Sequence, residues 1–289
     1  MNASKSAKTA IDFFTHNKQV SSAYSTTRNP FLSIIAVIQL PTMIKFFFIA
    51  DIALLVFYMV NHAMGAPFYT LTRLLNLDGE SSISTWYSVI QLACVAQLAG
   101  LFAARNAHFC QVKTWPLLFL PLVFLALSMD ELVQIHEWLG AKSDILLPGQ
   151  DRLNTVFRVT GIWMFLIGIP FVAGLFGLVF VLRKYLSTVP GVLPKFLLGL
   201  AVLFTGATLI EILSNFTQYG SFGYHLEVVC EEGFEMLGVT IILWALHDLL
   251  QGHGFSVHLD PVIEQRSTYV PDDRSWKHNF GLISEKSQL

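Results

Sequence analysis

Apolar runs of about 20 residues recur along the chain, separated by short polar connections. They cover approximately 42–63, 84–104, 115–139, 157–182, 193–214 and 224–250. A helix of about 20 apolar residues crosses the hydrocarbon core of a bilayer, so each run is long enough to span a membrane. The pattern therefore predicts an all-α membrane protein, a bundle of six transmembrane helices.

The segments that flank these runs are polar. Residues 1–28 are rich in Ser, Thr and Lys, and residues 252–289 carry scattered charges and Pro. Neither segment has the apolar content of a core, so we expect mobile tails around a transmembrane domain at 29–251. Residues 31–40, before Pro41, are predicted to form a short interfacial or re-entrant helix. No cleaved signal peptide is expected, because the N-terminal segment lacks an apolar region with a cleavage site.

Composition agrees with a membrane location and excludes some partners. Hydrophobic residues make up 54% of the 289 residues and charged residues 13%, well below the charged share of an average soluble domain. The net charge of −2 argues against a nucleic-acid partner. The 3 cysteines have no metal-type spacing, and their odd number argues against a complete disulfide framework.

Lys and Arg residues predict the orientation of the bundle, because cytoplasmic connections are enriched in them. They gather in both tails, in the second-to-third connection and in the fourth-to-fifth connection. With six spans, this places the N- and C-termini in the cytoplasm, and we expect the bacterial plasma (inner) membrane. The third-to-fourth connection, which is an outer one in this topology, fits the rule less well. It carries Lys142 and Arg152, with Arg158 at its border.

Acidic residues interrupt two of the apolar runs. The third run ends in SMDELVQIHEWLG, and the sixth begins with HLEVVCEEGFE. These stretches contain Asp130, Glu131, His136 and Glu137 in one, and Glu227, Glu231, Glu232 and Glu235 in the other. Glu211 lies near the end of the fifth run. The predicted topology puts all of these residues on the outer side, so we predict one acidic site in the outer half of the bilayer.

The spacing of the acids separates good chelating pairs from poor ones. Glu231 and Glu235 are four residues apart, and Glu232 and Glu235 are three apart, which puts each pair on one helix face. If the third run is one continuous helix, Asp130 and Glu137 also share a face but lie about 10 Å apart along the axis. The sixth run is therefore the better core for an ion site, and the third run is its facing wall.

A crowd of ionised carboxylates inside a bilayer is unfavourable, at about 2.5–3.5 kcal/mol each or more. A bound cation, protonation or a water-filled cavity would relieve the repulsion. Glu and His ligands suit iron, manganese or zinc, so a divalent metal is one candidate cofactor. Its predicted ligands are Asp130, His136, Glu137, Glu211, Glu231, Glu232 and Glu235. The alternative that helix-end acids simply reach water stays open.

Two helices that each supply carboxylates and a His resemble the ferritin-like di-iron bundles. The resemblance implies a metal centre between facing helices, but the Glu-x-x-His spacing of that family is absent here. The chain is also similar to the seven-span hydrolases related to ceramidases and progestin receptors in having a polar site between spans. It lacks their His-x-x-x-His motif, so the sequence assigns no family.

These patterns favour a membrane-embedded metal-dependent enzyme that acts on a lipid or another apolar substrate. Glu131 and Glu227 are the predicted catalytic residues that move protons, and Arg152 and Arg158 are predicted to bind a substrate head group. A proton- or cation-coupled transporter and a non-catalytic membrane subunit are the alternatives. A transporter needs polar groups through both halves of the membrane, whereas the inner half here is nearly apolar. Membrane lipid is the expected partner, and the oligomeric state is left open.

Two further features concern packing. Asp51, near the middle of the first run, is either a buried acid hydrogen-bonded to a neighbour or part of a polar path. Gly199 and Gly206 offer a small face where the fourth and fifth spans are expected to approach closely.

Overall fold

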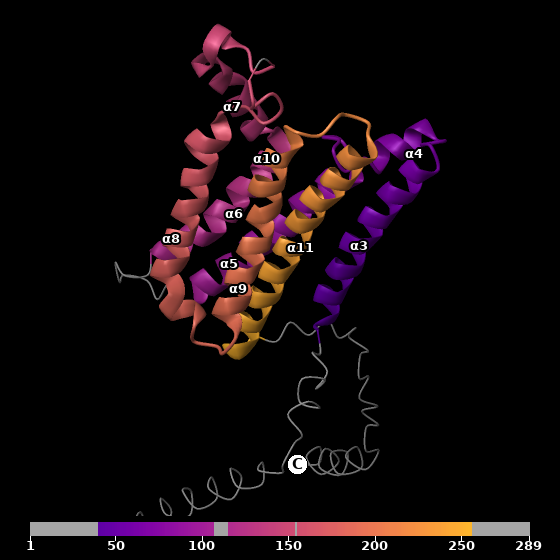
Figure 1. Cartoon of the computed structure of the whole chain (residues 1–289). Helices are drawn as coiled ribbons and strands as arrows, with labels where there is room; N and C mark the ends of the chain where they lie inside the picture. The colour runs from indigo at the N-terminus through magenta and orange to yellow at the C-terminus, as the bar shows by residue number, and fades with distance from the viewer. Residues whose placement is uncertain (1–39, 107–114, 154, 256–289) are drawn as a thin grey trace, which may run out of the picture. The chain divides into compact units, whose positions relative to one another are not determined.

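The computed structural model describes residues 40–106, 115–153 and 155–255. Within them the regular structure is entirely helical, and six helices are long and apolar enough to cross a membrane. The six are α3 (Thr42–Ala63), α5 (Ile83–Asn106), α6 (Pro116–Val133), η3 with α8 (Met164–Leu186), α9 with η4 and α10 (Val192–Ser214), and α11 (Phe222–Gly252). They run side by side in Figure 1. The prediction of an all-α chain with six spanning-length helices is confirmed.

Two of the six helices contain a π-helical segment. Short helices lie in two of the connections between the long helices. The component elements are η3 (Met164–Gly168), α8 (Ile169–Leu186), α9 (Val192–Phe204), η4 (Thr205–Ile210) and α10 (Glu211–Ser214). The short connecting helices are α4 (Tyr69–Leu74), α7 (Ile135–Ser143), η1 (Asp144–Leu146) and η2 (Pro148–Gln150).

The chain divides into two compact units, Met1–Leu249 and Leu250–Leu289. Of the second unit, the structure describes only residues 250–255, where α11 ends. The predicted tail at 1–28, the predicted helix at 31–40 and nearly all of the tail at 252–289 lie outside the described residues. The cytoplasmic location of both termini therefore stays a prediction, as does the plasma membrane.

Pro and Gly set several of the helix ends. α3 begins directly after Pro41, and α6 begins at Pro116, where the missing N–H costs no intrahelical bond. α3 ends where Gly65 takes a φ of 77°, which lets its N–H bond to the carbonyl of His62. Gly191, with a φ of 83°, allows the tight turn that starts α9.

The third apolar run is two helices, so the prediction of one helix over 115–139 is wrong. α6 ends at Val133 because Gln134 adopts a left-handed conformation, with φ 61° and ψ 43°. α7 then starts in a new direction. For a residue other than Gly this conformation costs about 1–2 kcal/mol. Hydrogen bonds from the residues after the break offset the cost, as described below.

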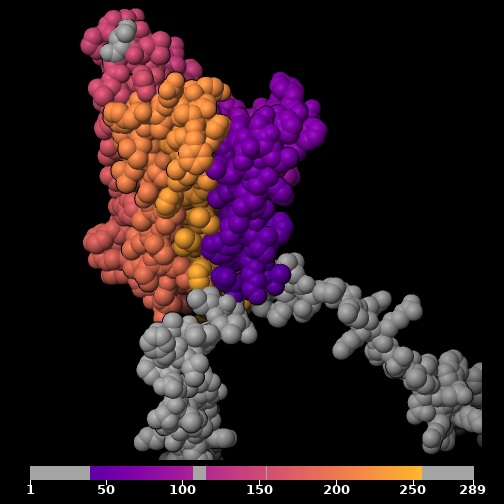
Figure 2. Space-filling model, turned by 45° about the vertical axis from the view of Figure 1, so that its right-hand side comes forward, coloured from indigo at the N-terminus to yellow at the C-terminus, as the bar shows by residue number. Residues whose placement is uncertain are grey.

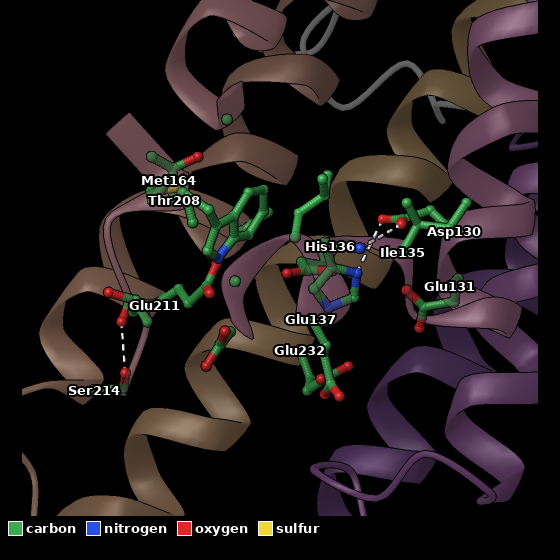
Figure 3. A pocket seen from close by; sticks show the side chains of 18 of the residues that line it. Asp130, Glu131, Ile135, His136, Glu137, Met164, Thr208, Glu211, Ser214 and Glu232 are labelled. Atoms are coloured by element: carbon green, nitrogen blue, oxygen red, sulfur yellow. Dashed lines mark hydrogen bonds and ion pairs between the residues drawn. The ribbon is translucent and has the colours of Figure 1, made fainter. Parts of the chain in front are cut away.

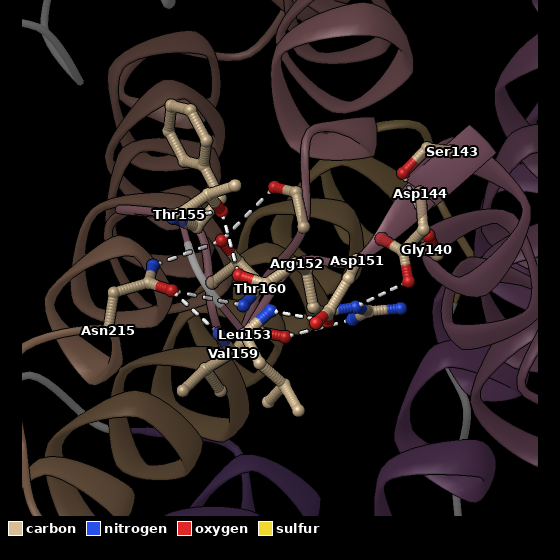
Figure 4. Close-up of polar contacts among 12 residues, drawn as sticks. Gly140, Ser143, Asp144, Asp151, Arg152, Leu153, Thr155, Val159, Thr160 and Asn215 are labelled. Carbon is tan, nitrogen blue, oxygen red and sulfur yellow. Dashed lines mark hydrogen bonds and ion pairs between the residues drawn. The ribbon is translucent and has the colours of Figure 1, made fainter. Parts of the chain in front are cut away.

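The fourth run also departs from the prediction, because residues 157–162 form turns and a bend, and the spanning helix is assigned only from Met164. Gly161 has a φ of 73°, which ends the preceding turns. The side chain of Asn215 accepts hydrogen bonds from the backbone N–H of Val159 at 2.9 Å and of Thr160 at 3.2 Å (Figure 4). These bonds satisfy backbone groups that a helix would otherwise have paired.

α9 packs on α11 with backbones in direct contact. A Cβ built on Gly199 would lie 2.6 Å from Cγ1 of Ile242, and one on Gly238 would lie 2.4 Å from the backbone N of Leu203. The sequence predicted Gly199 at a contact between the fourth and fifth spans. That prediction is wrong, because this glycine faces the sixth span.

α3 lies beside the first part of α11, as both views show (Figures 1 and 2). Tyr58 of α3 shares a buried cluster with Val228 and Met236 of α11 and with Leu77 of the connection before α5. This cluster fixes the start of α11 against the other helices. The same part of α11 carries the acidic row, which consists of Glu227, Glu231, Glu232 and Glu235.

Candidate functional site

A cavity of about 810 Å³ opens where α6 turns into α7. All of the long helices except α3 line it, together with α7 and the connection before α5. Its walls carry ten carboxyl side chains: Asp78, Glu80, Asp130, Glu131, Glu137, Glu211, Glu227, Glu231, Glu232 and Glu235. The basic side chains on its walls are those of His136 and Arg152. We call this space the acidic cavity.

The acidic cavity gathers nearly all of the predicted site residues. Glu131 and Glu227, all seven predicted metal ligands, and Arg152 line it. Arg158 does not. The chain brings together two stretches about a hundred residues apart because the end of α6 and the start of α11 lie at the same end of the bundle (Figure 1). The chemical roles of these residues stay predictions.

His136 folds back onto Asp130 across the break at Gln134. The backbone N–H of His136 donates to Oδ1 of Asp130 at 2.9 Å, and ring Nδ1 lies 3.0 Å from Oδ2 (Figure 3). One carboxylate thus holds both the backbone and the ring, which fixes the orientation of the imidazole. A continuous helix would not bring these two groups together, so the break creates the pair.

The surroundings of His136 favour its charged form. Burial alone lowers the pKa of His136, but the hydrogen bond with Asp130 and the negative charges of Asp130, Glu211 and Glu131 outweigh it and raise the pKa to about 9. At neutral pH the ring is therefore an imidazolium. It supplies one positive charge to a cavity with a large excess of carboxyl groups.

Several carboxyl groups of the cavity contact each other rather than a cation. Glu137 is hydrogen-bonded to Glu80, and this bond together with burial raises the pKa of Glu137. Glu227 and Glu231 are hydrogen-bonded in the same way on α11. A bond between two carboxyl groups requires a proton on one of them. Proton sharing is therefore one way in which repulsion among the carboxyl groups is reduced.

Glu227 has an atom that nothing in the protein satisfies. Its side chain is 8% exposed, and Oε1 is buried without a hydrogen-bond partner. Leaving a buried acceptor unpaired costs about 1–3 kcal/mol. A group with hydrogen to donate would remove this cost.

The two π-helical segments border the cavity. Met164 and Gly168 of η3 and Thr208 of η4 line it, followed by Glu211 (Figure 3). π-Helical turns are rare and occur frequently at functional sites. Figure 3 shows Glu211 approaching from the side opposite Asp130 and Glu131.

One side of the cavity is apolar. It is formed by α8 and α9 with the adjoining π-helical segments, through Met164, Ile167, Phe171, Val172, Leu203 and Phe204. The cavity therefore has an acidic wall on α6, α7, α10 and α11, and an apolar wall on α8 and α9.

Arg152 and Arg158 bind mainly to other groups of the protein, an aspartate and backbone carbonyls. Arg152 Nε lies 2.8 Å from Oδ2 of Asp144, and its Nη1 donates to the carbonyl of Val159 at 3.0 Å (Figure 4). Arg158 donates from Nε to the carbonyl of Asn215 at 2.7 Å. The proposed head-group clamp is thus not assembled, since the structure does not bring Arg158 to the cavity.

Two histidines near the acidic row do not line the cavity. The rings of His62 and His225 lie with their centroids 4.1 Å apart, and the hydroxyl of Tyr58 is 2.9 Å from Nδ1 of His225. Neither ring belongs to the lining of the acidic cavity.

Sequence reasoning missed the acids before α5. Asp78 accepts a hydrogen bond from the hydroxyl of Tyr224, and both residues line the cavity with Glu80. Burial and the neighbouring Glu80 raise the pKa of Asp78, although the bond with Tyr224 opposes the change. The signal was available, because Asp78 and Glu80 lie in the first outer connection of the predicted topology.

The geometry does not provide a ready metal site. Within residues 40–106, 115–153 and 155–255, no group of three or more His, Cys, Asp or Glu side chains is placed so that it could hold a metal ion. One reason is that Asp130 engages His136 Nδ1. The predicted iron, manganese or zinc cofactor therefore stays a prediction.

A family model described as a domain of unknown function (DUF8692) matches residues 46–249. The chain belongs to this family. No curated protein and no solved structure matches it. The matched residues contain the whole lining of the acidic cavity. The cavity therefore lies in the domain that defines the family.

Proposed function

We propose that the protein binds an amphiphilic organic cation, an ammonium group attached to an apolar chain, in the acidic cavity. The observation that carries this proposal is the pairing of an acidic wall with an apolar wall in one cavity next to membrane-spanning helices. Each wall matches one part of such a molecule.

The charge of the cavity supports a cationic ligand. Ten carboxyl side chains face two basic ones, and Asp144 already engages Arg152. A positive charge about 4 Å from one carboxylate gains about 4 kcal/mol at an effective dielectric constant of 20. A bound cation would also reduce the repulsion among the acids. Glu227 is the acceptor we assign to the ammonium group, because its Oε1 is buried and unpaired.

The size of the cavity supports an organic ligand rather than a lone ion. Its volume of about 810 Å³ lies within the usual range for small-molecule sites, about 300–1,000 Å³. Ile167 and Phe171 of the apolar wall suit a hydrocarbon chain. Burying such a chain contributes about 0.8 kcal/mol per methylene.

A metal-dependent enzyme is the second candidate. The observation that favours it is the electrostatic proximity of His136 to Glu131, Glu211 and Glu235. His136 would first have to release the proton that it holds with a pKa of about 9. Metal analysis of the purified protein tests this candidate, and stoichiometric iron, manganese or zinc would replace our first proposal.

A transporter receives less support. Away from the cavity, several polar groups pair within the protein, as Lys195 does with Asp248 and Gln91 with Asp51. Groups that are paired in this way are less available to a transported ion. Uptake of a labelled ammonium amphiphile into vesicles containing the protein would favour the transporter.

Three probes with one chain length test the proposal. Octylammonium, octanol and octanoate share the apolar chain and differ in the charge of the head group. In protein-containing nanodiscs at pH 7, we expect octylammonium to raise the unfolding midpoint and to bind at least tenfold more tightly than octanol. Octanoate should bind more weakly than octanol because the acids repel it. Equal binding of octylammonium and octanol would refute the role of the acidic wall.

A further inference from the structure

The segment between the third and fourth long helices exposes several large apolar side chains. It comprises α7, η1, η2 and the residues that follow to 159, apart from residue 154, and we call it the cap segment. Its large apolar side chains point outward: Trp138 is 59% exposed, Leu146 66% and Leu153 73%. Ile145 and Val156 are exposed as well. An exposed apolar surface of this kind indicates contact with something other than water.

Several polar groups of the cap segment pair within the protein, and its exposed polar side chains, Glu137, Lys142 and Gln150, suit the head-group layer rather than the hydrocarbon core. Arg152 pairs with Asp144 and with the carbonyl of Val159, and the hydroxyl of Ser143 donates to the carbonyl of Gly140 at 2.7 Å. A surface in contact with lipid requires this arrangement, because backbone and charged groups find no partners in hydrocarbon. A water-exposed segment would have the opposite arrangement.

The exposed apolar surface continues that of α6. Met129, Leu132 and Val133 are exposed on the last turns of α6, and Ile135 and Trp138 follow on α7. If α6 spans the membrane, these residues carry its lipid-facing surface past the helix end. Continuity with a lipid-facing surface favours lipid over a protein partner.

The cap segment also has the side-chain pair typical of membrane interfaces. The ammonium group of Lys142 lies over the ring of Trp138, 5.8 Å from its centroid. Trp concentrates at the head-group level, where Lys can extend its charge toward water. Figure 2 shows the cap segment projecting beyond the adjacent ends of α10 and α11.

We propose that the cap segment lies in the interfacial layer of the membrane, with Trp138, Leu146 and Leu153 in contact with lipid. Ile135, Leu139 and Gly140 of this segment line the acidic cavity. The part of the cavity lining that the cap segment supplies would then lie among lipid head groups. This inference does not depend on which ligand the cavity takes.

Spin labels test this placement directly. Leu146→Cys and Leu153→Cys are labelled with a nitroxide in a chain whose Cys94, Cys110 and Cys230 are replaced by Ser, and Gln150→Cys is the matched control. The protein is reconstituted into phosphatidylcholine–phosphatidylglycerol nanodiscs. Accessibility to oxygen, which concentrates in lipid, is compared with accessibility to a water-soluble nickel chelate.

We expect Leu146 and Leu153 to lie about 5–10 Å below the head-group surface, with Gln150 more accessible to nickel. Equal, high nickel accessibility at all three positions would overturn the proposal. Low accessibility to both reagents at 146 and 153 would also overturn it, since it would indicate a protein partner.

A second measurement keeps the native cysteines. Brominated lipids quench tryptophan fluorescence at short range. We expect the Trp138→Phe variant to lose a quenched component that the unchanged protein shows. If the quenching is the same in both proteins, Trp138 is not in lipid and the proposal fails.

Discussion

Asp51 and the acids of the cavity are both carboxyl groups within the bundle, but their surroundings differ. Asp51 is 0% exposed and accepts hydrogen bonds from the hydroxyl of Tyr87 at 2.6 Å, from Nε2 of Gln91 at 2.9 Å and from the hydroxyl of Thr240 at 2.8 Å. Donors from two other helices therefore surround it. The cavity acids face each other across an open space, with few donors.

The contrast separates structural acids from acids available to a ligand. Asp51 links α3 to α5 and α11, and it does not line the acidic cavity. The structure thus favours the first reading of Asp51, a buried acid hydrogen-bonded to its neighbours. Glu227 has the opposite situation, because it lines the cavity and its buried Oε1 has no hydrogen-bond partner. Both residues are acids within apolar runs, so the number of nearby donors distinguishes them.

Removing Asp51 should have the largest effect on stability. Asp51→Leu removes the buried acceptor that the side chains of Tyr87, Gln91 and Thr240 share, and we expect a loss of about 3–5 kcal/mol in the free energy of unfolding. Unfolding in detergent by titration with dodecyl sulfate measures it. Glu232→Leu is the matched cavity variant and should cost far less. Equal losses would remove the distinction between the two sites.

The pH dependence of stability should report the charge on His136. Its pKa in the folded state, about 9, lies above the ordinary value of 6.5. The stabilisation is therefore fully present below pH 6.5 and is lost as the pH rises through about 9. Because the ring is partly exposed, we expect about 1–2 kcal/mol between pH 6 and pH 10.

The His136→Gln variant isolates this contribution, because an amide does not titrate. We expect the difference in unfolding free energy between the unchanged protein and this variant to shrink as the pH rises. A difference that is constant with pH would show that His136 is not charged by its acidic neighbours.

The break at Gln134 should respond to substitution in a characteristic way. Gln134→Gly removes the strain of the left-handed conformation and should stabilise the protein by up to about 1 kcal/mol. Gln134→Ala keeps the strain and should not stabilise it. Thermal unfolding of the two variants measures the difference. If glycine destabilises the protein as alanine does, the left-handed break is not what holds His136 against Asp130.

Glu231→Gln should have the smallest effect on stability. The amide can donate to Glu227 and thereby replace a carboxyl–carboxyl hydrogen bond while it removes one ionisable group. We expect a change within about 1 kcal/mol, in the stabilising direction. The same dodecyl sulfate titration measures it. A loss comparable with that of Asp51→Leu would mean that the cavity acids are structural.

Much of the architecture could be predicted because it depends on the lengths of the apolar runs and on the alternating direction of successive spans. Runs of apolar residues identify six spanning helices, and alternation of direction puts Glu131, Glu211 and Glu227 at one end. The breaks could not be predicted in this way. The left-handed Gln134 depends on the acceptor supplied by Asp130, and the turns before Met164 depend on Asn215, which is distant in sequence.

The hydrogen-bond partners of each acid also could not be predicted from the sequence. Asp51 and Glu227 are both acids within apolar runs, and only the packing of helices distant in sequence supplies donors to one and a cavity to the other. Gly199 likewise identifies a close helix contact without indicating that the neighbour is α11. Local pattern therefore predicts the helices and their direction, whereas contacts between helices decide what each polar residue does.

The most direct test of the account is the affinity for octylammonium of the unchanged protein, Glu227→Gln and Asp151→Asn, measured in nanodiscs at pH 7. Asp151 is an acid outside the lining of the cavity, so its substitution should leave the affinity unchanged. Glu227→Gln should weaken binding at least tenfold, about 1.4 kcal/mol, because it removes the negative charge and replaces one carboxyl oxygen with an NH2 group that cannot accept a hydrogen bond. Equal affinities of all three proteins would contradict the assignment of the acidic cavity as a cation site.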